Sequence, residues 1–381
     1  MTAVRAPVSD PARQAVQLRI VLEELLGQHT FLTANAMRSR VRGDLDFAQA
    51  TINAVSRNTD GLTRLLTGVY GLRSGEQFRK LWAGHVLSLV DYAGAGARRD
   101  QLGQANARRA LDGYVSGIAD FLQSATRGAI GMHIDHLLTA ADAYAARDFP
   151  KAYALERTDY AHMFGLATSL AAGIARGGGG TVPADFDSPV QRLRSALSRL
   201  LGEHYELTVD AMRGAVSRAP DFRAAADLVN DNTRDLAGAF DVLFGRASAQ
   251  RFTSVWADHV DALMSYSAAL PVRDERAQAA ARARLTRFEQ QLAAFLATGT
   301  QGRLSAPAAA AASLSMHDRQ LLDQIDAYAA PDYAKAHDLS FEGYCHVILF
   351  VLLRVVVGEL LDAGLDPADL GEDLVSGGGP G

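Results

Sequence analysis

The chain has 381 residues, of which 48% are hydrophobic and 21% are charged, and its formal net charge is -5. This length is typical of two or three domains with ample cores, and a mildly acidic balance with scattered arginines argues against a nucleic-acid partner. The single cysteine, Cys345, excludes an internal disulfide and a thiolate metal cluster.

The N-terminal stretch MTAVRAPVSDPARQAV lacks the continuous apolar core of a secretory signal peptide. Two interpretations follow. The stretch is either a cytoplasmic start or the start of a mature, extracytoplasmic chain whose leader has been replaced by Met1.

Helical periodicity runs through the first half of the chain, with many Ala, Leu and Arg residues and no alternating strand pattern. This pattern predicts six helices, near residues 12–42, 46–68, 74–96, 101–126, 130–146 and 149–175. Asp46, Ser74 and Asp148 stand where helix N-caps are expected, and Pro150 suits a first helical turn.

The second half of the chain repeats the first. LLGQHTFLTANAM at residues 25–37 returns as LLGEHYELTVDAM at residues 200–212. FRKLWAGHVLSLVDYAGA from Phe78 returns as FTSVWADHVDALMSYSAA from Phe252, and MHIDHLLTAADAYAARDF from Met132 returns as MHDRQLLDQIDAYAAPDY from Met316. Such a match indicates a tandem duplication.

The predicted fold class is therefore all-α, a tandem duplication of a helical bundle of roughly 175–190 residues with about six helices per copy. The predicted boundaries are residues 1–176 for the first copy, 177–188 for a Gly-rich linker, 189–370 for the second copy and 371–381 for a disordered tail.

The most apolar segment, residues 347–358, contains Arg354 and is too short to cross about 30 Å of hydrocarbon, so no transmembrane segment is predicted. A buried helix is the simplest interpretation of this segment. The alternative is a face near Val351 that mediates a homodimer or binds a protein partner.

Eight of the ten histidines fall into four matched pairs on the predicted inner faces of helices. Apolar residues at spacings of three and four form a seam that includes these histidines. The pairs are His29 with His204, His85 with His259, His133 with His317, and His162 with His346. An unsatisfied buried polar group costs about 1 to 3 kcal/mol, so the imidazoles need partners.

One interpretation is a buried polar network without a cofactor. Asn58 and Asn232 fall in the seam of the second helix of each copy, Tyr92 and Tyr266 lie two turns beyond a histidine, and Asp159 lies three residues before another. Side chains of these types can satisfy one another's hydrogen bonds. This interpretation predicts a structural or interaction repeat module.

The other interpretation is that the histidines of each copy converge on one metal or cofactor. The first set is His29, His85, His133 and His162, and the second set is His204, His259, His317 and His346. Imidazole suits Zn, Cu, Ni and Fe, and the cores of helical bundles commonly hold such sites. Asn58, Asn232, Tyr92 and Tyr266 would then orient the imidazoles through hydrogen bonds.

Further ligands are also candidates, namely Met37, Met132, Met212, Met316 and His136. Thioether combined with imidazole favours copper or an axial pair on haem. The predicted cofactor is therefore copper or haem b, or none if the histidines form only a polar network.

Sequence signatures of catalysis are missing. The chain has no Glu-x-x-His pair, no Cys-x-x-Cys-His, no His-Glu-x-x-His and no P-loop. Apart from the histidines, no set of residues that could serve as acid, base or nucleophile recurs in both halves of the sequence. An enzyme is therefore not expected.

The phrases LWAGHVLSLVDYAGA, HIDHLLTAADAYAARDFPKAYALERTDYAHM and LLGEHYELTVDAM resemble a group of bacterial, usually exported, duplicated helical proteins that are often labelled copper amine oxidase. The likeness extends from about Leu18 to Leu361 and includes Trp82, His85 and Tyr92. It implies an exported helical repeat protein. The chain has no Asn-Tyr pair, from which a copper amine oxidase makes its quinone, so the resemblance does not extend to the oxidase reaction.

The sequence as a whole predicts non-catalytic binding of copper, or alternatively of haem b, by histidines in the two bundle cores. The competing hypothesis is the structural or interaction module with a buried His, Asn and Tyr network and no cofactor.

Overall fold

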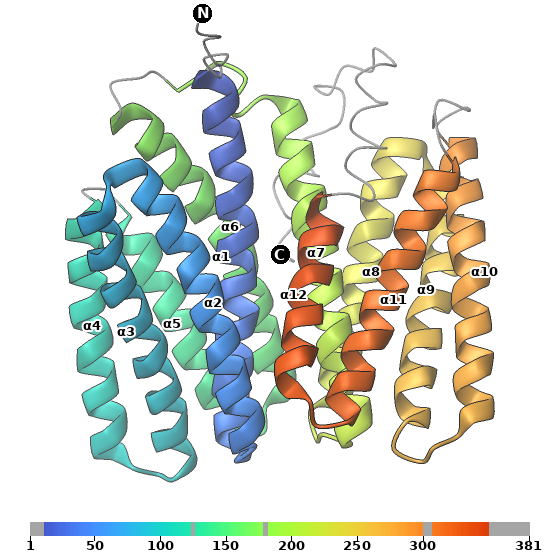
Figure 1. The fold of residues 1–381 in the computed structure, drawn as a ribbon, viewed down its shortest axis with the longest axis horizontal. Helices are drawn as coiled ribbons and strands as arrows, with labels where there is room; N and C mark the ends of the chain where they lie inside the picture. Colours follow the sequence, from blue (N-terminus) through green and yellow to red (C-terminus); the bar gives the residue numbers. More distant parts are fainter. Residues whose placement is uncertain (1–10, 123–125, 178–181, 300–306, 350–381) are drawn as a thin grey trace, which may run out of the picture.

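The computed structural model describes residues 11–122, 126–177, 182–299 and 307–349. In these residues the chain forms twelve α-helices and no β-strand, which confirms the all-α class (Figure 1). The first half contains α1 (Pro11–Arg42), α2 (Leu45–Tyr70), α3 (Leu72–Ala97), α4 (Gln101–Leu122), α5 (Arg127–Ala145) and α6 (Phe149–Gly177). The second half contains α7 (Pro189–Ser217), α8 (Phe222–Phe244), α9 (Arg246–Ala269), α10 (Glu275–Gly299), α11 (Pro307–Ala329) and α12 (Tyr333–Leu349).

The helices of the two halves pack in matching ways. Consecutive helices contact each other, and the first helix of each half, α1 or α7, also contacts the third, fifth and sixth helices of that half. This packing is consistent with a repeated six-helix bundle that has α1 or α7 at its centre. Figure 1 shows the halves side by side, with α1 and α6 next to α7 and α12.

Glycines in the left-handed region separate the second and third helices of each half. Gly71, with φ of 86°, lies between α2 and α3, and Gly245, with φ of 79°, lies between α8 and α9. Glycine adopts such a φ without the steric cost that a Cβ would bring. The matched positions of these glycines explain why both helix pairs turn within one residue.

The predicted helix starts are partly right. Asp148 precedes α6, and its carboxylate accepts a hydrogen bond from the Lys151 N–H at 3.4 Å, which confirms an N-cap. Asp46 and Ser74 lie inside α2 and α3, because Leu45 and Leu72 begin those helices. These two predicted caps are wrong.

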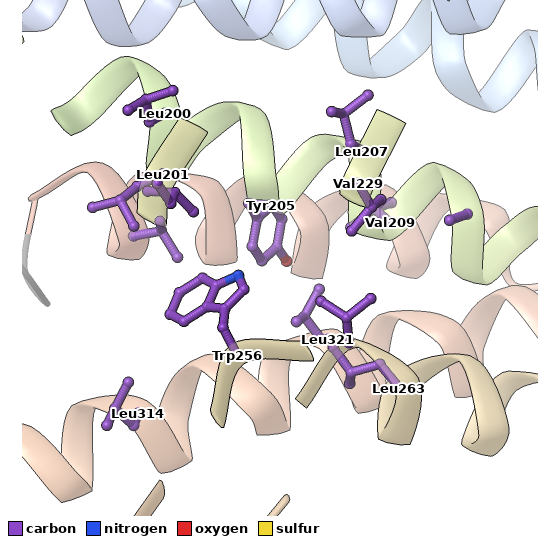
Figure 2. Packing of buried hydrophobic residues seen from close by; sticks show 14 of the residues in the cluster. Leu200, Leu201, Tyr205, Leu207, Val209, Val229, Trp256, Leu263, Leu314 and Leu321 are labelled. Atoms are coloured by element: carbon purple, nitrogen blue, oxygen red, sulfur yellow. The ribbon is translucent and has the colours of Figure 1, made fainter. Parts of the chain in front are cut away.

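Buried apolar side chains form a core that crosses the boundary between the halves. Figure 2 shows part of it, with Trp256 beside Tyr205 and Leu263 beside Leu321. The same cluster includes Phe31, Tyr160 and Phe164 of the first half. The two halves therefore share packed apolar surface rather than meeting only through a linker.

Buried polar side chains also cross this boundary. Arg38 of α1 forms ion pairs with Glu156 of α6 and Asp210 of α7, and all three side chains are buried. Asn35 donates a hydrogen bond to Asp210 at 2.7 Å. Removing one partner of a buried ion pair lowers the free energy of unfolding by about 3 to 5 kcal/mol. These three side chains therefore couple the two halves strongly.

Several predicted segments fall partly or wholly outside the described residues. In the predicted linker, Gly177 ends α6 and Ser188 caps α7 by accepting a hydrogen bond from the Gln191 N–H at 3.4 Å. Residues 178–181 of the linker, the apolar segment near Val351 and the tail 371–381 lie outside the described residues. None of the described helices combines the length and apolar character that a membrane span requires.

Candidate metal centres

Three histidines from three helices of the first half meet in its core. His29 of α1, His85 of α3 and His133 of α5 each offer one nitrogen, and these nitrogens lie within 4.8 Å of one another. The Nε2 atoms of His29 and His85 are 3.1 Å apart. We call this group the first triad. Its three residues are at most 1% exposed.

Aromatic side chains enclose the first triad. Trp82, one turn before His85 on α3, lies with its ring centroid 4.9 Å from those of both His29 and His85. Tyr114 of α4 stacks on His85 at 4.3 Å with an interplanar angle of 17°. These contacts restrict the rotation of the imidazoles and keep water away from them.

A buried carboxylate holds the third imidazole. His133 donates from Nδ1 to the Asp159 Oδ2 at 2.8 Å, and Asp159 of α6 is fully buried. Thr30 donates to the same oxygen at 3.3 Å, and His136 Nδ1 lies 3.4 Å from the other oxygen. Burial alone would raise the pKa of Asp159, but His133 and His136 hold it below its ordinary value.

The contact with Asp159 decides which nitrogen of His133 is free. In the neutral ring, Nδ1 carries the proton that the carboxylate accepts, so the lone pair lies on Nε2. This Nε2 is buried and has no hydrogen-bonding partner among the described residues. This nitrogen is therefore a potential metal ligand that bonds to nothing in the described part of the chain.

Burial favours the neutral form of His29 and His85. Burial, and then the neighbouring imidazoles, lower the pKa of His29 and His85 well below the ordinary value of a histidine. Neutral imidazole is the form that binds metal ions. The site can therefore offer lone pairs at neutral pH.

A matching group lies in the second half. His204 of α7, His259 of α9 and His317 of α11 place one nitrogen each within 4.8 Å of the others, and we call them the second triad. Trp256 lies 4.7 Å from His204, and Phe288 stacks on His259 at 4.1 Å. Burial lowers the pKa of His204 to about 3.

No protein-family model, curated protein or solved structure matches this chain. The geometry of its own residues therefore carries the functional argument.

The acidic side chain beside the second triad comes from a different helix than the one beside the first triad. In the repeat, Asp159 corresponds to Gly343, so α12 offers no acid there. Asp318 of α11 lies instead with Oδ1 3.3 Å from His259 Nδ1. Burial, and then nearby Glu289, raise the pKa of Asp318 well above its ordinary value.

The structure brings three histidines together in each half, not the predicted four. His162 Nε2 donates to the Ala129 carbonyl at 2.8 Å, and His346 Nε2 lies 3.1 Å from the Ser313 carbonyl. On α6, Asp159 rather than His162 faces the triad. The prediction that His162 and His346 join the sites is corrected accordingly.

The predicted additional ligands also lie elsewhere. Met132 and Met316 are 50% exposed. Met37 and Met212 are buried but come eight residues after His29 and His204, about 12 Å along the helix. His136 contacts Asp159 rather than the triad. The ligand atoms gathered at each centre are therefore imidazole nitrogens.

The predicted orienting side chains have other partners. Asn58 donates to the Leu25 carbonyl at 2.9 Å, and Asn232 donates to the Leu200 carbonyl at 3.0 Å. These matched bonds tie α2 to α1 and α8 to α7, one turn before the histidine.

The two tyrosines predicted to orient the imidazoles also bond elsewhere. Tyr92 donates to Asp142 at 3.0 Å, and Tyr266 donates to Asp326 at 2.8 Å. Tyr92 and Tyr266 each come seven residues after a triad histidine, about 10 Å along the helix. Neither tyrosine holds an imidazole of the triads.

Three side chains around the triads were missed by sequence reasoning. Tyr114 lies on α4, where no chemistry was predicted, and Asp318 directly follows the predicted ligand His317 on α11. Asp159 was placed in a polar network but not on His133. The sequence did contain one signal for Asp159. The matched position in the second half holds Gly343, so the two halves differ in charge at this point of the repeat.

Proposed function

We propose that the protein binds one transition-metal ion in each half, through three neutral imidazoles, and that copper is the preferred ion. The observation that carries this proposal is the unpartnered ring nitrogen of His133. Its Nδ1 is committed to Asp159, and its buried Nε2 has no partner among the described residues. A metal ion at the centre of the triad would accept that lone pair.

The spacing of the triads supports an ion. Imidazole nitrogens bound to one tetrahedral zinc-like ion at about 2.0 Å lie about 3.3 Å from each other. The 3.1 Å between His29 and His85 and the 4.8 Å limit for each triad bracket this value. A small rotation of the rings would bring all three nitrogens to an ion.

The spacing argues against haem b. Two axial nitrogens on haem iron stand on opposite faces, about 4 Å apart, with the macrocycle between them. The His29 and His85 nitrogens are closer than this, at 3.1 Å. Trp82 and Tyr114 also pack directly against these imidazoles, where the macrocycle would have to lie.

Copper is favoured by the ligand type. Three nitrogens without thiolate or thioether form a borderline set, and for such a set the affinity of divalent first-row ions peaks at copper. Zinc suits the same three ligands with one open position, so it is the main competitor.

The surroundings of the triads favour binding or storage of the ion over catalysis. The rings are buried, and the carboxylate beside the first triad is occupied by His133, Thr30 and His136. We also propose, from the resemblance to exported proteins, that the protein acts outside the cytoplasm.

The proposal is tested on protein purified without chelators and loaded with copper or zinc. We expect about two ions per chain by mass spectrometry, copper retained against zinc, and no Soret band. The variant H85A/H259A should lose the ions while it keeps helical circular dichroism. If loading leaves the wild-type protein without metal and its melting temperature unchanged, the cofactor-free structural module is the better description.

A further inference from the structure

The two triads differ at one pair of contacting positions. In the repeat, Thr30 corresponds to Tyr205 and Asp159 corresponds to Gly343. The first half thus has a small side chain facing an acid, and the second half has a large side chain facing a glycine. Both pairs adjoin the triad of their half.

In the first half this pair holds an imidazole. Thr30 donates to Asp159 Oδ2 at 3.3 Å, and the same oxygen accepts the His133 Nδ1–H at 2.8 Å. A carboxylate on the far nitrogen of a ligand fixes the ring and raises its basicity. Removing such a partner typically lowers metal affinity about 10- to 100-fold.

In the second half the tyrosine fills the place of the acid. A Cβ added at Gly343 would lie 2.0 Å from the Oη and 2.4 Å from the Cζ of Tyr205. No side chain can therefore stand at position 343 while Tyr205 keeps its place. The Tyr205 ring lies 5.8 Å from that of His317, the counterpart of His133.

His317 consequently lacks the support that His133 has. Both of its ring nitrogens are buried without a hydrogen-bonding partner among the described residues. Asp318 does not replace Asp159, because it lies beside His259, at 3.3 Å, and not beside His317. No contact in the described part of the chain fixes the tautomer of His317.

From these contacts we propose that the two centres differ in metal affinity. Asp159 is a positioning residue that makes the first triad the tighter centre. The second triad has Tyr205 and Gly343 in place of that support and binds its ion more weakly. This inference rests on the proposed metal binding. It implies that the ions enter in order, so that the first half retains its ion while the second half exchanges it.

The test measures each centre separately in the full chain. H259A leaves only the first triad, and H85A leaves only the second. In competition with a chromogenic copper chelator, H259A should bind copper about 10- to 100-fold more tightly than H85A. Equal affinities would overturn the inequality and leave the proposed function standing. No binding by either variant or by the wild type would overturn the proposed function.

Two further variants test the residues named. D159N in the H259A background should lower the affinity about 10- to 100-fold and change the copper electron paramagnetic resonance signal, whereas the matched change D318N in the same background should do neither. Y205T/G343D in the H85A background should tighten the second centre and bring its signal toward that of the first. If D159N binds as tightly as its parent, with the same signal, Asp159 has no positioning role.

Discussion

Tyr160 and Tyr344 meet at the boundary between the halves, with their phenol oxygens 3.0 Å apart. They occupy matching positions on α6 and α12, so the repeat brings the same residue to the boundary from both sides. Gly27 and Gly202, also matched, make room for the two rings: a Cβ at Gly27 would lie 2.7 Å from Tyr344 Oη, and one at Gly202 would lie 2.4 Å from Tyr160 Oη. The contacts at this boundary are therefore reciprocal, because each half offers a glycine to the tyrosine of the other.

The glycines at this boundary are expected to be intolerant of a methyl group. Gly202→Ala should destabilise the protein, because overpacking a filled core costs about 1 to 3 kcal/mol. Gly165→Ala is the matched control. It adds a methyl group on α6 where nothing lies within 4 Å, so it should be neutral or slightly stabilising. Thermal unfolding of both variants checks this, and equal melting temperatures would contradict the close packing at Gly202.

The phenol pair itself is expected to behave as one unit. Tyr160→Phe alone should cost about 1 kcal/mol or more, because it leaves the fully buried Tyr344 hydroxyl without its partner. Y160F/Y344F removes both hydroxyls and should lose less than the sum of the single changes. A double-mutant cycle from denaturant unfolding measures the coupling. Additive single effects would show that the hydroxyls do not act together.

The helices and the inward direction of the histidines could be predicted from the sequence. The helical period places His29 and His85 among apolar residues, and the repeated sequence shows the same pattern around His204 and His259. Their burial in the structure follows from the same pattern. These features depend on local spacing alone.

The membership of the triads could not be predicted in full. Asp159 and His162 are three residues apart on α6, so they point only about 60° apart on the same side of the helix. Which of them faces His133 depends on how α6 is rotated against its neighbours. Sequence spacing does not contain that rotation, which explains why His162 was predicted as a ligand and the contact of Asp159 with His133 was not predicted.

The pairing of Tyr205 with Gly343 was also beyond the sequence. Each change is visible in the repeat, but the residues come from α7 and α12 and meet only through tertiary packing. The core shared by the two halves could not be predicted for the same reason. Helical periodicity indicates which faces of a helix are apolar, but it does not indicate which other helix packs against them.

Metal loading is expected to stabilise the fold through the triads. A ligand that binds only the native state adds about 2.7 kcal/mol per site at 100 times its dissociation constant, so copper should raise the melting temperature of the wild type by several degrees. H85A/H259A should show no rise. His337→Ala is the control, because His337 is a buried histidine outside the triads that stacks on Phe47 at 5.1 Å. A rise that persists in H85A/H259A would place the metal elsewhere.

Stability is expected to fall between about pH 5 and pH 8 because of Glu206. Burial, and then Asp210, raise the pKa of this carboxyl to about 8, although Arg213 and Arg38 oppose the shift. In this window the folded protein binds a proton at Glu206 that the unfolded chain has released, so the free energy of unfolding decreases as the pH rises. Glu206→Gln keeps a neutral side chain at every pH, and the difference in melting temperature between the variant and the wild type should grow toward pH 8. A difference that stays constant from pH 5 to pH 8 would mean that Glu206 is ionised throughout the window, with its charge satisfied by Arg213 and Arg38.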